Sequence, residues 1–147
     1  MSLERLKDWV GRTQTMEDLA APFPVRALAA TFDDNDPDPR HGDALPPLWH
    51  WLYFLDAAPQ SKIGGDGHAE RGDFLPPVPL PRRMWAGSRF SFDGEPVRVG
   101  DAISRASQIK SVAPKTGSTG SMVFVTVRHT ISGPRGVSFV EEHDIVY

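Results

Sequence analysis

The sequence has no cysteine, which excludes disulfide bonds, thiolate catalysis and cysteine-based zinc or iron–sulfur sites. Long hydrophobic runs are also missing. The longest uncharged apolar stretch, residues 44–55, has 12 residues with two prolines and a histidine, which is too short to cross a bilayer. The first residues, MSLERLKDWVGR, lack the apolar core of a secretory signal. We therefore expect a soluble, cytoplasmic protein that does not enter a membrane.

An excess of positive charge is missing as well. The chain carries 16 basic and 19 acidic side chains, a net charge of −3, which argues against a dedicated nucleic-acid-binding protein. The charge is unevenly distributed along the sequence. Residues 1–73 hold 7 basic and 13 acidic side chains (−6), and residues 74–147 hold 9 basic and 6 acidic ones (+3). The basic half is suited to attract an anionic ligand.

Proline, by contrast, is abundant. The chain has 14 prolines, and 11 of them lie between Pro22 and Pro81. Because proline fixes φ and donates no backbone hydrogen bond, this stretch cannot form continuous helix or sheet. A length of 147 residues corresponds to one domain. We expect residues 1–147 to form a single domain with a helical N-terminus, a proline-rich middle and an all-β C-terminal half.

Helical signals are confined to the N-terminal half. Apolar residues at helical spacing predict a short helix over residues 3–10 and a second one over residues 25–32, with Pro24 in its first turn. Thr15, three residues before Asp18, resembles a variant of the motif that caps a helix N-terminus. The apolar run 48–55 fits a short helix or a strand equally well.

Strand signals dominate the C-terminal half. Strands are predicted over residues 85–92, 101–113, 120–132 and 137–147, with a turn at residues 133–136 between the last two. His129 shares a strand face with three valines, which favours a core or interface histidine, whereas His143 is expected at an exposed or edge position. Long antiparallel strands must twist and curl. The pattern therefore predicts an α+β domain in which a curved antiparallel sheet is wrapped around a helix.

Four segments resemble the N-terminal half of the MaoC-like dehydratase family, which includes mesaconyl-CoA hydratases and type 2 hydroxyacyl-thioester dehydratases. They are LPPLWHWLYFL (45–55), GGDGHAERGDFLPPVPLPRRMWAG (64–87), FVTVRHTI (124–131) and EEHDIVY (141–147). The resemblance implies a hot-dog fold, in which a curved antiparallel sheet wraps a helix. It also implies reversible addition of water across the α,β double bond of an acyl thioester.

The same resemblance sets expectations about partners and cofactors. The substrate would be an acyl-CoA or acyl-carrier-protein thioester, and no cofactor besides the substrate's own coenzyme A or phosphopantetheine is implied. In such two-hot-dog proteins the catalytic Asp/His pair usually sits in the second half, and this chain stops about where that half would begin. A lone half exposes a strand edge that needs cover. We therefore expect a homodimer or pairing with a second hot-dog half, and neither a nucleic acid nor a membrane as partner.

One segment resembles the catalytic motif of MaoC-type hydratases, which has the form D-x-N-P-x-H. In DPDPRH, Asp36 and His41 have the spacing of the catalytic pair, but Asp38 replaces the asparagine and Arg40 replaces an apolar residue. The resemblance makes Asp36 and His41 the candidate acid–base pair. The alternative is a surface loop rich in proline and aspartate.

Candidate substrate-binding residues come from two of the family-like segments. His50, between two tryptophans, would line the acyl tunnel or would be a core histidine bonded to backbone. Arg82 and Arg83 would meet phosphates or a substrate carboxylate, or would form ion pairs. Trp85 and Gly87 are further candidates in the same segment, and Trp85 is also expected to pack beneath the sheet.

The sequence thus favours one component of a hydro-lyase that acts on acyl thioesters. The alternative is a non-catalytic acyl-CoA-binding or scaffold domain that pairs with a catalytic half. A short branched dicarboxylic acyl group fits if Arg82 or Arg83 meets its carboxylate, and a fatty 3-hydroxyacyl group fits if the aromatic cluster around His50 lines the tunnel. Fold alone does not decide between these functions.

Overall fold

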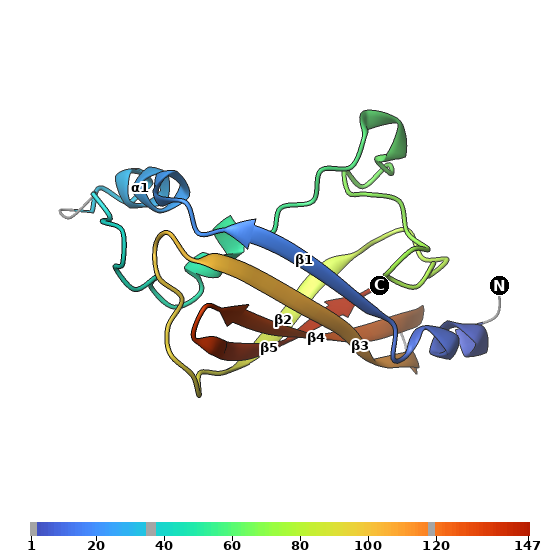
Figure 1. The fold of residues 1–147 in the computed structure, drawn as a ribbon. Coiled ribbons are helices and arrows are strands. Elements are labelled where there is room, and N and C mark those ends of the chain that lie inside the picture. The colour runs from blue at the N-terminus through green and yellow to red at the C-terminus, as the bar shows by residue number, and fades with distance from the viewer. Residues whose placement is uncertain (1–2, 35–37, 118–119) are drawn as a thin grey trace.

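The computed structural model describes residues 3–34, 38–117 and 120–147. Its main element is one antiparallel sheet with the strand order β1-β3-β4-β5-β2 (Figure 1). The strands are β1 (Thr13–Leu19), β2 (Met84–Ser91), β3 (Ala102–Gly117), β4 (Gly120–Gly133) and β5 (Gly136–Val146). The helices are α1 (Pro22–Thr31) and the short 3₁₀ helices η1 (Leu3–Trp9), η2 (Trp49–Leu52) and η3 (Gln60–Lys62). The predicted α+β class is confirmed.

The four strands predicted in the C-terminal half are all present. β3 has 16 residues and continues beyond its predicted end at Ala113, and β4 has 14 residues. Alternate residues of β4, among them Val123, Val125 and Val127, are buried on one face. Strands of this length twist strongly, and Figure 1 shows the resulting curved sheet.

The N-terminal segment differs from its prediction. Residues 13–19 form strand β1, which pairs with β3 from Thr13 opposite Gln108 to Leu19 opposite Ala102. Thr15 therefore lies inside a strand and caps no helix. The pattern TQTMEDL gave little strand signal because β1 is an edge strand whose side chains are mostly exposed. Its conformation depends on backbone pairing with β3, which a local sequence window does not reveal.

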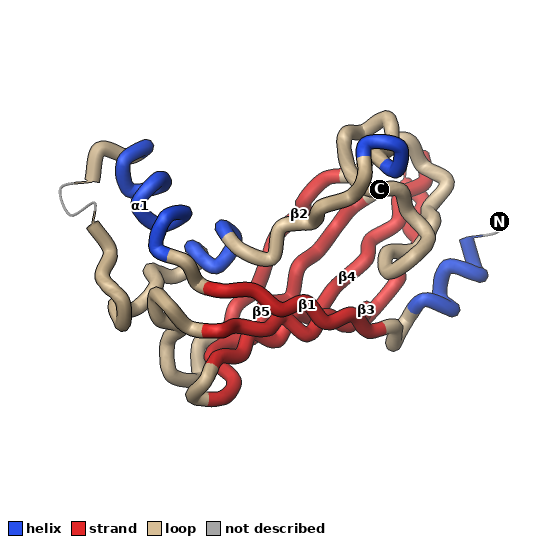
Figure 2. The backbone as a smooth tube through the Cα atoms, turned by 45° about the horizontal axis from the view of Figure 1, so that its top comes forward, coloured by secondary structure: helices blue, strands red, loops and turns tan. Residues whose placement is uncertain are grey.

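The helix α1 is shorter than the strands and stands at one end of the sheet, just after β1 (Figures 1 and 2). Pro22 and Pro24 occupy its first turn, where a missing N–H costs nothing. It buries Val25 and Ala29 and contacts η2. In the part of the chain that the structure describes, no helix is long and apolar enough to span a lipid bilayer.

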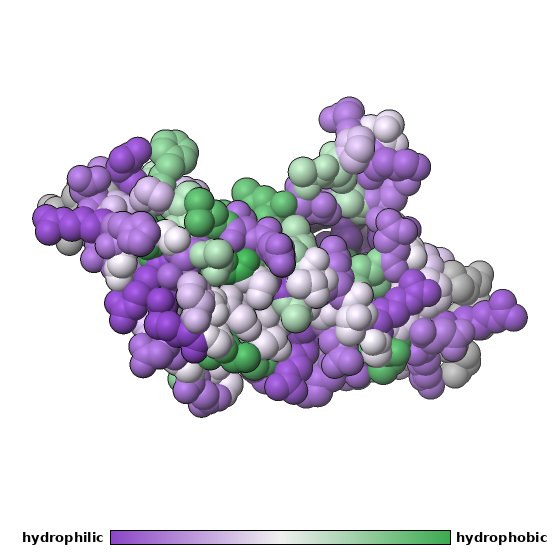
Figure 3. All heavy atoms as spheres, viewed as in Figure 1, coloured by the Kyte–Doolittle hydropathy of each residue, from purple (hydrophilic) through white to green (hydrophobic). Residues whose placement is uncertain are grey.

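The proline-rich segment 56–83 rises at the opposite end of the sheet from α1 (Figure 2). It has little regular structure apart from η3, as its proline content predicts. Val78 is buried in a hydrophobic cluster with residues of the sheet, and Phe74, Leu75 and Leu80 pack against the same cluster. Figure 3 shows this segment as a separate raised lobe with a hollow beneath it.

The inner face of the sheet carries two hydrophobic clusters separated by polar residues. The cluster near α1 contains Ile103, Ile131 and Phe139, and the cluster near η1 and Val78 contains Ile109 and Val127, among others. Between them the same strands present a polar row: Arg105 and Ser107 on β3, His129 on β4, and Glu141 and His143 on β5. Buried polar groups destabilise a core unless they are paired, so this row marks the candidate site.

Candidate functional site

The centre of the polar row is Glu141, whose side chain is almost fully buried. Its Oε2 accepts hydrogen bonds from His50 Nε2 at 3.2 Å and from Trp51 Nε1 at 3.2 Å. Its Oε1 accepts one from Ser88 Oγ at 2.8 Å and lies 3.5 Å from His143 Nδ1. Four side chains from η2, β2 and β5 therefore converge on one carboxylate.

These hydrogen-bond partners lower the pKa of Glu141. Burial alone would raise its pKa, but hydrogen bonds from His143, His50, Ser88 and Trp51 outweigh burial and hold the pKa well below its usual range. Glu141 is therefore ionised at neutral pH. A carboxylate with a lowered pKa is a weak proton acceptor, and the oxygens of Glu141 lie against two imidazole rings, those of His50 and His143.

His129 lies beside Glu141 in the β4–β5 pairing. A 2.7 Å hydrogen bond joins its Nδ1 to Ser107 Oγ on β3. Burial, together with the neighbouring positive charge of Arg105, lowers the pKa of His129 from 6.5 to about 4. His129 is therefore neutral at pH 7, and its ring supplies polar but uncharged surface to the site.

The segment that carries His50 and Trp51 is held over the sheet by specific anchors. Tyr53 donates its hydroxyl to the Ala21 carbonyl at 2.6 Å, and the Phe54 amide donates to Asp18 Oδ2 at 2.7 Å. Burial and then the charge of Asp18 raise the pKa of Tyr53 to about 12. Leu48 and Phe54 have φ values of 73° and 58°, which is unusual for residues with a side chain. Backbone strain of this kind concentrates at functional sites.

A cleft of about 520 Å³ opens over the polar row. Its apolar walls include Trp51, Tyr53, Phe54, Leu55 and Trp85, and its polar surface comes from His50, Asp56, Arg105, His129, Glu141 and His143. The rings of Trp51 and Trp85 meet edge to face with centroids 6.4 Å apart. An apolar cleft with a few fixed polar groups is the usual form of a small-molecule site.

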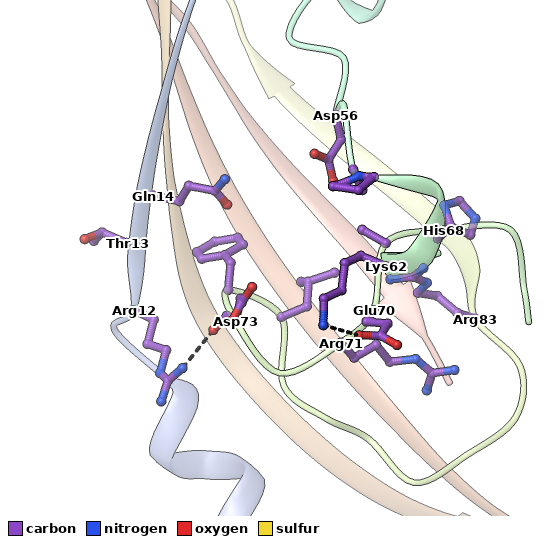
Figure 4. Close-up of a pocket in the computed structure, with 15 residues that line it drawn as sticks. Arg12, Thr13, Gln14, Asp56, Lys62, His68, Glu70, Arg71, Asp73 and Arg83 are labelled. Carbon is purple, nitrogen blue, oxygen red and sulfur yellow. Dashed lines mark hydrogen bonds and ion pairs between the residues drawn. The ribbon is translucent and has the colours of Figure 1, made fainter. Parts of the chain in front are cut away.

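A second cavity, of about 980 Å³, lies beneath the segment 56–83 (Figure 4). Most of its basic groups have partners. Lys62 Nζ lies 3.8 Å from Glu70, Arg83 lies 3.2 Å from Asp66, and Arg12 donates to the Asp73 carbonyl at 2.8 Å. These contacts join residues within the lobe and connect the lobe to Arg12, the residue just before β1. No group of three potential metal ligands is present among the residues with described positions.

A model of the hydroxyacyl-thioester dehydratase type 2 family matches residues 48–147, the part of the chain that contains the cleft and most of the sheet. The chain belongs to this family. It is 44% identical over 139 residues to mesaconyl-C(4)-CoA hydratase of Chloroflexus aurantiacus. That match covers 95% of this chain and 49% of the relative, so the chain spans about half the length of the relative.

Solved structures of low sequence identity share the fold. The ChsH1–ChsH2 complex of Mycobacterium tuberculosis has a TM-score of 0.65 at 12% identity, covering 98% of this chain and 87% of that one. The HadBC complex of the same organism, a 3R-hydroxyacyl-ACP dehydratase, has a TM-score of 0.56 at 15% identity, with 97% and 99% covered. A hot-dog-like protein of Thermanaerovibrio acidaminovorans has a TM-score of 0.54 at 12% identity, with 100% and 88% covered. The hot-dog fold and the MaoC-like resemblance expected from the sequence are confirmed.

In this member of the dehydratase type 2 family, the structure brings two of the sequence candidates together. His50 and Trp85 both line the cleft. Gly87 follows Trp85 across a bulge in β2. Trp85 does not pack beneath the sheet as expected, because it lies on an edge strand at the rim of the cleft with 59% of its surface exposed.

The remaining candidates lie elsewhere. Arg83 lines the second cavity rather than the cleft, and Arg82 is exposed. His41 is exposed and its ring packs on Gly100, away from the residues that line the cleft. Asp36 lies outside the described residues, so its pairing with His41 stays a prediction.

Sequence reasoning missed Glu141 and Arg105 and did not assign a site role to His129 or His143. The available signal was the alternation of β5, which puts Phe139, Glu141 and His143 on one face. An acidic side chain flanked by inward-facing residues on a core strand is unusual enough to suggest a polar site.

Proposed function

We propose that this chain is one hot-dog half of a hydro-lyase that acts on acyl thioesters. It would take part in the reversible hydration of an enoyl-CoA or the dehydration of a 3-hydroxyacyl thioester. The observation that carries the proposal is the inner-face cleft, in which aromatic walls surround the ionised Glu141 and its imidazole partners. The name of the Chloroflexus relative, a hydratase of an enoyl-CoA, supports the same reaction class.

In this proposal the cleft holds the acyl group. Trp51 and Trp85 flank its mouth, while Tyr53 and Phe54 supply apolar contact area along the chain of the substrate. Burial of such a group is favourable at roughly 25 cal/mol per Å² of apolar surface removed from water. The hydrogen bonds of Glu141 keep the polar floor of the cleft in one arrangement before substrate arrives, which lowers the entropic cost of binding.

Hydration also requires a base that activates water and an acid that protonates the α-carbon. Glu141 and His129 are poor bases, because their surroundings hold both pKa values below the neutral range. We infer that the acid–base pair comes from a second hot-dog half. The competing form of the proposal assigns it to Asp36 and His41. Neither form needs a cofactor, since the reaction is proton transfer and addition of water.

The partner would be a second copy of the chain or a different hot-dog half. β1 and β2 are the edges of the sheet. β2 exposes Met84 and Trp85, whereas β1 is largely polar. An apolar edge strand is a site for pairing, and the names of two structural neighbours describe complexes. The cytoplasmic location expected from the sequence stays a prediction.

The test is enoyl-CoA hydration, followed by the loss of enoyl-thioester absorbance. The purified chain would be assayed alone and with a second half, such as the half of the Chloroflexus relative that this chain does not match. Activity that requires the second half is expected. Activity of the chain alone that is lost in Asp36→Ala and His41→Ala would instead assign the pair to this chain.

The second candidate function is a non-catalytic acyl-thioester-binding or scaffold domain. The low basicity of Glu141 and His129 favours it. Calorimetry with several acyl-CoAs separates the two functions, because a scaffold would bind them saturably without turnover, whether or not a second half is present. Absence of both binding and turnover would exclude both functions.

A further inference from the structure

The two tryptophans at the mouth of the cleft are held by their indole N–H groups. Trp51 Nε1 donates a hydrogen bond to Glu141 Oε2 at 3.2 Å. Trp85 Nε1 donates to Ser88 Oγ at 3.2 Å, and Ser88 Oγ donates in turn to Glu141 Oε1 at 2.8 Å. A serine hydroxyl can accept one hydrogen bond while it donates another. Both indoles are therefore connected to one carboxylate, Trp51 directly and Trp85 through Ser88.

A bulge in β2 brings Trp85 and Ser88 to the same face of the sheet. Side chains alternate along a strand, so residues three positions apart face opposite sides of a regular sheet. In β2, however, Trp85 pairs with Ile145 and Ser88 pairs with His143, so three steps along β2 match two steps along β5. Ala86 is the extra residue. A bulge of this kind can re-aim a side chain next to a functional site, and here it turns Trp85 toward the cleft.

The anchored rings are otherwise open to solvent. Trp51 is 46% exposed and Trp85 is 59% exposed. Fixing an exposed side chain costs conformational entropy, and here hydrogen bonds and ring contacts offset that cost. The two rings meet edge to face, and Phe90 packs on Trp51 with the ring centroids 6.0 Å apart. Glu141 is itself held in place by His50. The mouth of the cleft therefore has a width that the protein sets in advance.

We propose that Glu141 is a positioning residue for Trp51 and Trp85, and that this anchored pair limits the width of the acyl group that enters the cleft. The inference rests on the proposed function, because it takes the occupant of the cleft to be the acyl group of a thioester. The carbonyl group and the α,β double bond of an enoyl thioester are conjugated, so this part of the substrate is flat. A bulky tetrahedral branch beyond the double bond would have to displace one ring and break its hydrogen bond. The substrate class assigned here is thus enoyl thioesters without such a branch.

Two effects act on a wider ligand in opposite directions. A wider acyl group buries more apolar surface, so in a mouth that adjusts freely it binds more tightly than a narrow one. In an anchored mouth the extra atoms enter a fixed space and strain their neighbours, so the wider group binds more weakly. The order of the two affinities therefore shows whether the mouth is anchored.

The test uses two thioesters with the same reacting group. But-2-enoyl-CoA carries a methyl group on C3, and 4,4-dimethylpent-2-enoyl-CoA carries a tert-butyl group there. Calorimetry on the full chain gives the ratio of the two affinities, and with a second half the ratio of the two kcat/KM values gives the same comparison. We expect wild type to prefer the methyl ligand by about 10-fold or more, the range for a misfit in an apolar pocket. Ser88→Ala should lower this ratio by about 10-fold. Ser88→Thr keeps the hydroxyl and should restore much of it.

Ser91→Ala is the matched control, because Ser91 lies on the same strand, is exposed and donates to Asp93 rather than to Glu141. It should leave the ratio unchanged. The indole N–H signals in heteronuclear NMR spectra provide a second measurement. The Trp85 signal, assigned by its loss in Trp85→Phe, should shift and exchange faster with water in Ser88→Ala. Neither change is expected in Ser91→Ala.

Four results would count against the inference or its basis. A higher affinity of wild type for the tert-butyl ligand, or the same ratio in wild type and Ser88→Ala, would overturn the inference and leave acyl-thioester binding intact. An unchanged Trp85 signal in Ser88→Ala would also overturn it, because the anchor would be absent. Weaker pairing with a second half at an unchanged ratio would overturn it too, by assigning Trp85 to the interface between the halves. If wild type binds neither thioester, the proposed function itself fails. Should Ser88→Ala not fold, Trp85→Phe removes the same anchor and should lower the ratio.

Discussion

Glu141 on β5 and Arg105 on β3 lie on the same face of the sheet with only β4 between them, yet their charges have different hydrogen-bond partners. The carboxylate accepts hydrogen bonds from η2 and β2, and His143 of its own strand lies 3.5 Å away. The guanidinium contacts a sulfur atom and an aromatic ring. The hydrogen-bonding capacity of Glu141 is therefore met by other side chains of the protein, whereas Nε of Arg105 is buried without a hydrogen-bond partner.

The first residue-scale prediction concerns Glu141. The substitution Glu141→Gln removes the negative charge to which His50 and Ser88 donate hydrogen bonds. These buried donors then lose a charged acceptor. We expect a loss of about 1 to 3 kcal/mol in the free energy of unfolding, measured by urea denaturation with tryptophan fluorescence. The control is Glu142→Gln on the outer face, where partners Arg89 and Lys110 are exposed, and less than about 1 kcal/mol is expected. Equal losses in both variants would contradict the central role of Glu141.

The second concerns His129 and pH. Its pKa is lowered from 6.5 to about 4 in the folded protein, so the unfolded chain binds more protons between these values. The stability that neutral His129 contributes is therefore complete above pH 6.5 and falls as the pH drops toward 4. The loss amounts to about 3 kcal/mol. The free energy of unfolding, measured from pH 4 to 6.5, should depend less steeply on pH in His129→Gln than in wild type. Parallel curves for the two proteins would show that His129 titrates normally.

The sequence predicts the long strands, but it does not predict which residues of neighbouring strands pair with one another. Hydrophobic alternation and the turn at residues 133–136 predict the β4–β5 hairpin. A regular hairpin would place Val140 opposite His129, but the register shifts between Ile131 and Ser132 and puts Glu141 there. A shift of one residue exchanges the two faces of a strand. The inward position of Glu141 and His143 therefore depends on a bulge that has no clear local signal.

The other elements of the site depend on contacts between segments that are distant in sequence. His50 was recognised as a candidate because of its aromatic neighbours, but its partner is 91 positions away. The segment over residues 49–54 is held by Asp18 and Ala21, in a region where the sequence suggested a helix cap. Composition and periodicity describe each segment separately, whereas this site is built from η2 and the four strands β2, β3, β4 and β5.

An element-scale prediction concerns the loop after β2. Gly94 donates its N–H to the Ser138 carbonyl at 3.0 Å, and a Cβ at this position would lie 1.9 Å from the Val137 carbonyl oxygen. Gly94→Ala must push this loop away from the start of β5. We expect a loss of about 1 to 3 kcal/mol in the free energy of unfolding. Gly65→Ala, where no atom lies within 4 Å of the added Cβ, should cost less than about 1 kcal/mol. Similar losses in both variants would show that the loop is not constrained.

At the scale of the whole molecule, the two edges of the sheet differ in character. β2 presents Met84 and Trp85 to solvent, while β1 presents mostly polar residues. We predict that size-exclusion chromatography with light scattering at micromolar concentration will find a dimer, or a stable pair when a second hot-dog half is added. Met84→Lys should weaken this association by placing a charge on the apolar edge. A chain that stays monomeric in both experiments would contradict the pairing.

The polar row also separates the hydrophobic clusters that stabilise the two ends of the sheet. Apolar packing stabilises one end through Ile103, Ile131 and Phe139 and the other through Ile109 and Val127, while the middle depends on side-chain hydrogen bonds. We therefore predict that each end opens without exposing the hydrophobic cluster of the other. Amide hydrogen exchange would then report two cooperative units on the same three strands, and occupancy of the cleft would couple them by slowing exchange at both ends together.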